Sequence, residues 1–80
     1  MQDTRKLSEI DVGEKVVVCK INSSEKISRR LYDIGIIKDT VIECVGRSPL
    51  KDPSAYLIRG AVIALRSEDS ENIIVRKASD

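Results

Sequence analysis

The sequence lacks histidine, phenylalanine and tryptophan, and these absences remove several classes of function. Histidine is the usual proton-transfer group near neutral pH, so no Ser-His or Cys-His nucleophile pair can form within the chain. Neither glycine-rich phosphate-binding motif, G-x-x-x-x-G-K-[ST] or G-x-G-x-x-G, occurs. We therefore expect a protein that is not an enzyme, with no catalytic residues and no cofactor.

Only two cysteines are present, Cys19 and Cys44, and each stands among β-branched residues. A zinc site usually needs four Cys or His ligands, and a stable disulfide is disfavoured in the cytoplasm. Both thiols are therefore expected to be small side chains inside strands. The acidic residues Glu68, Asp69 and Glu71 fit the first turn of a short helix without any metal. We predict no metal site.

A large excess of one charge sign and long apolar runs are also missing. Lys and Arg number 14 against 13 Asp and Glu, with no basic half or tail. A nucleic-acid partner is therefore not expected, and two tyrosines are too few for a base-stacking platform. The longest apolar run, residues 61–65, is far shorter than the roughly 20 residues of a membrane-spanning helix. No hydrophobic leader follows Met1, so we expect a cytoplasmic protein without membrane insertion.

The chain does contain an excess of β-branched apolar residues, with 11 Ile and 8 Val against 5 Leu. Such residues favour strands over helices. The pattern predicts five short strands, at residues 15–21, 41–45, 56–59, 61–66 and 73–76. Gly46 indicates a bulge or bend, and Gly60 a tight hairpin. We expect one domain, residues 1–80, that is mainly β and forms a small closed barrel of about five antiparallel strands.

One α-helix is expected after the first strand. Apolar residues recur there at helical spacing, at Ile27, Leu31 and Ile34. Gly35 follows as the C-terminal cap, and Asn22 with Glu25 has the spacing of a capping box. Two shorter turns, capped by Ser8 and Ser67, are expected to close the barrel ends.

In the first expected strand, both faces carry apolar residues. Val17, Cys19 and Ile21 alternate on one face, which we interpret as the inward one. Val16 and Val18 lie on the other face and indicate that this face is also partly covered.

Four segments match, in order, the motifs of one known family. They are residues 30–35, RLYDIG, against R-L-x-D-L-G; residues 48–53, SPLKDP, against A-P-L-G-D-P; Gly60 with residues 64–66, ALR, against G-x-x-[LIV]-A-L-R; and residues 73–75, IIV, against I-x-V. The chain thus resembles the FeoA family over residues 7–75. Lys51 and Asp39 depart from the pattern, because each stands where the family usually has Gly.

The resemblance implies an SH3-like barrel and a role in bacterial ferrous iron uptake. FeoA-like proteins are thought to act with FeoB, a membrane transporter with a cytoplasmic GTPase domain (G domain). The leading hypothesis is therefore a non-enzymatic accessory protein that binds this G domain. The alternative is a metal-responsive module similar to the C-terminal domain of iron-dependent repressors. A weak homo-oligomer also stays open.

Six residues are candidates for contact with such a partner. A leucine and a tyrosine beside a proline-containing loop suit a protein-binding patch, as does an aromatic residue beside the apolar stripe of the helix. Arg29 and Arg30 could assist GTP hydrolysis in trans, but a solvated helix face paired with Asp33 explains them more simply. The candidates are Arg29, Tyr32, Pro49, Leu50, Lys51 and Tyr56.

Overall fold

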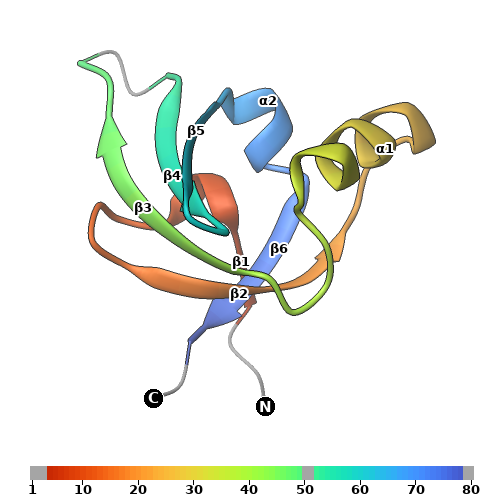
Figure 1. Ribbon diagram of the computed structural model, residues 1–80, viewed down its shortest axis with the longest axis horizontal. Helices are drawn as coiled ribbons and strands as arrows, with labels where there is room; N and C mark the ends of the chain where they lie inside the picture. The colour runs from red at the N-terminus through yellow and green to blue at the C-terminus, as the bar shows by residue number, and fades with distance from the viewer. Residues whose placement is uncertain (1–3, 50–51, 79–80) are drawn as a thin grey trace.

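The computed structural model describes residues 4–49 and 52–78 of the chain. One six-stranded sheet curls around the core, with α1 on one side and the short α2 between α1 and the far end of the sheet (Figure 1). The elements in chain order are β1 Thr4–Lys6, the 3-10 turn η1 Leu7–Glu9, β2 Lys15–Ile21, α1 Glu25–Ile34, β3 Val41–Arg47, β4 Ser54–Ile58, β5 Ala61–Leu65, α2 Ser67–Ser70 and β6 Ile73–Lys77.

All paired strands are antiparallel, in the order β1-β6-β2-β3-β4-β5. This confirms the mainly β fold with one α-helix after the first long strand. The sheet has one strand more than the five expected, because the polar segment Thr4–Lys6 pairs with β6. The expectation of closure was wrong: over the described part of the chain, β1 and β5 are separate sheet edges with no ladder between them.

The core face of β2 is the opposite of the one expected. Val16 and Val18 are fully buried, whereas Val17, Cys19 and Ile21 are only half-buried. The pairing register of β2 with β6 shifts between Val18 and Lys20, which marks a bulge. Because a bulge inserts one residue, the alternation changes there, and Ile21 packs against the core although it begins on the outer face.

Helix α1 covers the core with the predicted apolar stripe. Leu31 is fully buried, and Ile27 and Ile34 pack beside it at the edge of the core. The predicted capping box at Asn22 was wrong, because the helix begins two residues later. Ser24 is the N-cap, and its hydroxyl accepts a hydrogen bond from the Ile27 backbone N–H at 3.4 Å. Gly35 ends the helix as predicted, in a left-handed conformation with φ of 107°.

The strand β4 returns to β5 through the tight hairpin predicted at Gly60. Arg59 and Gly60 both have positive φ, 52° and 84°, as a two-residue type I′ turn requires. The bulge predicted at Gly46 is also present, as a register shift between Cys44 and Gly46. The hairpin turn and the bulge together fix the register of β3, β4 and β5.

We had expected Ser67 to cap α2, but Arg66 is the N-cap residue, and the capping acceptor comes from a distant loop. The Asp52 carboxylate accepts a hydrogen bond from the Ser67 backbone N–H at 2.8 Å and another from the Ser67 hydroxyl at 3.4 Å. At the other side of α2, Arg30 of α1 pairs with Asp69 at 2.5 Å. Helix α2 therefore links α1 to the segment that precedes β4.

Candidate functional site

A surface hollow of about 420 Å³ lies where the connection after α1 meets the β4–β5 hairpin. It is lined by Ile37, Lys38, Asp39, Thr40, Val41 and Arg59. We call these six residues the hairpin hollow. Ile37 is 36% exposed and Val41 52% exposed, so apolar surface faces solvent between two cationic side chains. Exposed apolar residues beside arginine are typical of protein-binding sites.

The walls of the hairpin hollow are held by the backbone. Asp39 donates its N–H to the Val18 carbonyl at 2.8 Å, and Val18 donates back to the Thr40 carbonyl at 2.9 Å. The Thr40 hydroxyl accepts from the Ile37 N–H at 3.2 Å and donates to the Gly35 carbonyl at 3.4 Å. Because both hydrogen bonds of the Thr40 hydroxyl are made within the turn, this side chain holds the turn in place. It adds little polar surface to the hollow.

Two of the residues that line the hairpin hollow have a left-handed backbone conformation. Asp39, with φ of 73°, and Arg59, with φ of 52°, are the non-glycine residues of positive φ in residues 4–49 and 52–78. The value at Asp39 explains why the family motif favours glycine here, and Asp is among the side chains that tolerate this conformation. The departure noted in the sequence therefore leaves the turn intact.

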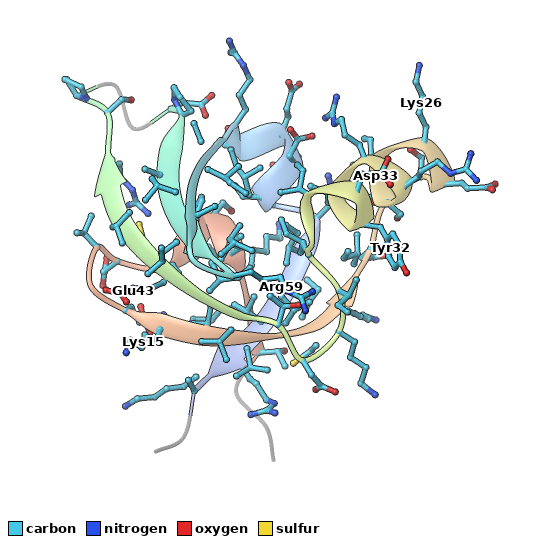
Figure 2. The ribbon with its side chains drawn as sticks, viewed as in Figure 1. Lys15, Lys26, Tyr32, Asp33, Glu43 and Arg59 are labelled. Atoms are coloured by element: carbon cyan, nitrogen blue, oxygen red, sulfur yellow. The ribbon has the colours of Figure 1, made fainter. Side chains whose placement is uncertain are left out.

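The Arg59 side chain lies against the end of α1. A Cβ atom added at Gly35 would stand 3.1 Å from Arg59 Cδ, so any larger residue at Gly35 would push this side chain away. Figure 2 shows Arg59 below the C-terminal end of α1, with Tyr32 on the exposed side of the same helix. Tyr32 is 66% exposed and lies one turn before the hollow begins.

Of the six residues predicted from the sequence, two lie on α1. Arg29 and Tyr32 are both exposed, so both are available to a partner. Arg29 lines a shallow hollow of about 280 Å³ formed by Lys26, Ile27, Arg29, Arg30 and Asp33. We had expected the two arginines to pair with Asp33 on the same helix. Instead, Arg30 pairs with Asp69 of α2. The contact role of Arg29 and Tyr32 stays a prediction.

Three more predicted residues belong to the segment between β3 and β4. Pro49 is exposed, and Leu50 and Lys51 lie outside the described residues. In Figure 1 the ends of β3 and β4 that flank this segment lie at the opposite side of the molecule from α1, with α2 between them. Helix α2 is hydrogen-bonded to Asp52 on one side and to Arg30 of α1 on the other, which the sequence did not indicate.

The sixth residue, Tyr56, was wrongly predicted to be a surface contact. It is 1% exposed and packs in the core, because β4 turns Ser54, Tyr56 and Ile58 inward. Its hydroxyl donates to the Leu7 carbonyl at 3.5 Å. Burial raises the pKa of the Tyr56 phenol, and hydrogen bonding to the Ser54 and Ser70 side chains opposes this effect. Tyr56 is thus a structural residue.

The sequence interpretation missed Ile37, Val41 and Arg59 as surface residues. Arg59 could have been found, because a residue before glycine in a two-residue hairpin must stand at an exposed turn. Ile37 and Val41 carried no such signal, since a β-branched residue is expected to be buried as readily as exposed. Their exposure depends on how the turn after α1 packs against β2.

The titratable groups with shifted pKa values do not line the hollow. A salt bridge joins Arg5 of β1 to Glu14, and the hydrogen bond from Arg5 holds the pKa of the Glu14 carboxyl below its ordinary value. Cys44 is buried and Cys19 half-buried, both in strands as predicted, and both are free thiols. In the described ranges, no group of three or more His, Cys, Asp or Glu residues is placed to hold a metal ion.

No helix among the described residues is long and apolar enough to cross a membrane. Over residues 5–77, the chain matches the model of the FeoA domain family. It is 30% identical over 74 residues to a fusion protein of Fe(2+) transport protein A and the Fe(2+) transporter FeoB from Porphyromonas gingivalis. That match covers 92% of this chain but only 9% of the length of the fusion protein.

Solved structures share the fold. A FeoA-like protein from Clostridium acetobutylicum is 31% identical with a TM-score of 0.90, covering 100% of this chain and 93% of that one. A FeoA from Stenotrophomonas maltophilia, solved with zinc and described as a procaryotic SH3 domain protein, is 24% identical with a TM-score of 0.77 over 88% and 87%. The latter likeness concerns the fold alone, and it confirms the SH3-like architecture predicted from the sequence.

The fold also occurs in a manganese-dependent transcriptional repressor. That protein is 22% identical with a TM-score of 0.88, and the match covers 98% of this chain and 44% of the repressor. At this identity the likeness shows the fold alone, whereas the family model covers nearly the whole chain. The chain therefore belongs to the FeoA family of ferrous iron transport proteins.

Proposed function

We propose that this protein is a non-enzymatic, cytoplasmic accessory protein of ferrous iron uptake that binds the cytoplasmic G domain of a FeoB-like transporter. The observation that carries the proposal is the fusion protein, in which a segment similar to this chain is part of one polypeptide with FeoB. Covalent linkage raises the effective concentration of two domains for each other to the millimolar range. Fusion is therefore advantageous for two domains that must associate but bind each other only weakly when they are separate.

The surface of the molecule supports a binding role. Tyr32, Ile37 and Val41 expose apolar area on and after α1, and Arg29 and Arg59 add cationic groups nearby. Aromatic residues and arginine are enriched among the residues that dominate binding energy at interfaces. The pKa shifts of Tyr56 and Glu14 come from burial and from an ion pair outside the hollow, so neither supports catalysis there.

The test is a titration of ¹⁵N-labelled protein with the G domain of the FeoB from the same organism. It is run without nucleotide, with GDP and with a non-hydrolysable GTP analogue. We expect saturable shifts of amide signals on α1 and around the hairpin hollow. No binding in any nucleotide state overturns the proposal.

Variants locate the surface. Tyr32→Glu and Leu50→Asp place a charge on the two predicted contact regions, and each is expected to weaken binding about tenfold or more. The matched control is Val12→Glu, because Val12 is 56% exposed and lies away from α1, between η1 and β2. If only one of the two variants weakens binding, the interface excludes the other region.

The repressor-like fold supports one competing function, a metal-responsive module. Titration with Fe(II) under anaerobic conditions, followed by the same amide signals, separates the two. Stoichiometric micromolar binding together with no response to the G domain would favour metal sensing. Binding of the G domain that is independent of added metal supports the accessory role.

A further inference from the structure

Strand β5 forms one edge of the sheet, and its sequence offers no protection to that edge. Natural sheets guard exposed edges with charges, prolines or very short strands. The five residues of β5 are Ala61, Val62, Ile63, Ala64 and Leu65, which contain no charge and no proline. An edge of this kind is a template for pairing with another strand.

The register shows which backbone groups face outward from this edge. Ile58 and Ala61 flank the two-residue hairpin turn and therefore form a hydrogen-bonded pair. Because pairs alternate along antiparallel strands, the N–H and C=O groups of Val62 and Ala64 point away from β4. Among the described residues, neither makes a backbone hydrogen bond outside its strand. Val62 is 65% exposed and Ala64 is also exposed, so the edge is open to solvent.

The outer face next to this edge is apolar as well. Leu57 pairs with Val62 and Ala55 with Ala64, so both outward-facing cross-strand pairs of β4 and β5 lack a polar side chain. Between β2 and β3 the outer face is mixed: Lys15 pairs with Glu43, and the two lie together in Figure 2, whereas Val17 pairs with Val41, which is 52% exposed. An antiparallel sheet normally presents polar residues to water. The outer face of β4 and β5 is therefore apolar up to the open edge.

The charges at the two ends of β5 indicate what binds there. Arg59 precedes the strand and Arg66 follows it, both are exposed, and neither forms an ion pair within residues 4–49 and 52–78. An incoming strand with acidic residues at its ends would place a carboxylate beside each guanidinium. Opposite charges on neighbouring strands stabilise pairing, and like charges oppose it.

A second copy of the chain fits poorly. Antiparallel pairing of β5 with itself about Ile63 would place Val62 opposite Ala64 of the other copy, which satisfies the backbone. The same register would bring Arg59 of each copy next to Arg66 of the other, at both ends of the strand. Two pairs of adjacent arginines would therefore repel each other.

We propose that the open edge of β5 accepts an extended segment of a partner protein as an added strand, and that this segment is apolar in its centre and acidic at its ends. Main-chain hydrogen bonds to Val62 and Ala64 supply affinity, and the flanking arginines select the ends. The inference rests on the proposed function for the identity of the partner, which would be the FeoB-like transporter. The edge itself is tested without the transporter.

The first experiment uses a synthetic heptapeptide, Glu-Val-Thr-Val-Thr-Val-Glu, with blocked termini. We expect binding that shifts the amide signals of β5 and slows hydrogen exchange at Val62 and Ala64. The matched peptide with lysine at both ends should bind about tenfold more weakly. Binding without slower exchange at these two amides overturns the proposal, and so does equal affinity for the two peptides.

Two variants sharpen this result. Ala64→Pro removes an edge N–H that takes no part in pairing with β4, so the fold is retained and peptide binding should be lost. The double variant Arg59→Glu and Arg66→Glu should reverse the preference, binding the lysine-ended peptide more tightly. Unchanged peptide affinity in Ala64→Pro, with the other amide signals in place, contradicts the proposal. Concentration-dependent dimers that the peptide dissociates would show that a second copy occupies the edge instead, and would also contradict it.

The G domain of FeoB is then tested with the same Ala64→Pro variant. Loss of G-domain binding supports the transporter as the source of the added strand. Unchanged G-domain binding overturns the β5 edge as its docking site while leaving the proposed function intact. If the peptide binds but the G domain does not, the β5 edge is supported as a strand-binding site and the proposed function is contradicted.

Discussion

The two tyrosines show how one residue type takes two roles. Tyr56 is 1% exposed in the core and Tyr32 is 66% exposed on α1. Removing a buried aromatic side chain typically costs 3–5 kcal/mol, because it leaves a cavity. We expect Tyr56→Ala to lower the free energy of unfolding by about that amount, and Tyr32→Ala to change it by less than about 0.5 kcal/mol. Urea denaturation of both variants checks the contrast, and similar losses in the two would contradict the burial assigned here.

At the same scale, Glu14 makes the stability depend on pH. Its carboxyl has a pKa lowered from 4.5, mainly by the hydrogen bond from Arg5. The stabilisation is thus complete above the unfolded-state pKa and is lost as the pH falls through the lower folded-state value. At pH 7, Glu14→Gln should cost about 0.5 kcal/mol, as expected for a solvent-screened pair.

The difference between wild type and Glu14→Gln should disappear in acid, where the wild-type carboxyl is protonated too. Denaturation curves between pH 2 and 7 measure this. The control is Glu71→Gln, because Glu71 is exposed and forms no ion pair among the described residues. A difference of constant size at every pH would contradict the assignment.

At the scale of elements, the strands were predictable because their signal is local. Runs such as residues 15–21 and 73–76 are rich in β-branched residues, and these preferences act within each strand. Helix caps were less predictable. Asn22 and Ser24 are both good caps, and the choice depends on the turn that brings Leu31 onto the core. Ser67 was misjudged because its partner, Asp52, is 15 residues away in sequence.

The Asp52 cap can be tested by two substitutions. Asp52→Ala removes both acceptors from the N-terminus of α2 and should cost about 1 kcal/mol. Asp52→Asn retains one oxygen acceptor and should cost less than half as much. Hydrogen exchange at the Ser67 amide should become faster in the alanine variant alone. If Asp52→Ala changes neither the stability nor this exchange rate, α2 does not depend on the cap.

At the scale of the whole molecule, the closure of the sheet was not predictable. Strand β1 consists of Thr4, Arg5 and Lys6, whose polar sequence gives no strand signal, and it forms only by pairing with β6. Whether the last edge meets the first is decided by long-range packing. The same holds for the candidate site: the exposure of Val41 and the burial of Tyr56 depend on which strand faces they occupy, and a residue's type does not reveal this.

The single core predicts that sheet and helix unfold together. Leu31 of α1 is fully buried among residues of every long strand, so the helix face and the sheet share one apolar cluster. In small domains such a cluster usually gives two-state unfolding. The chain has two tyrosines and no tryptophan, so in Tyr32→Phe the fluorescence reports Tyr56 alone. Far-ultraviolet circular dichroism reports the backbone of helix and sheet.

In this Tyr32→Phe background, the two probes should give the same urea midpoint. Adding Leu31→Ala should lower the free energy of unfolding by about 2–5 kcal/mol and move both midpoints together. That loss is a large fraction of the 5–15 kcal/mol typical of a domain, so the variant would be marginally folded. Circular dichroism that changes at lower urea than the Tyr56 signal would mean that α1 detaches from an intact sheet. A shared midpoint shows that the surface carried by α1 exists only while the sheet is folded.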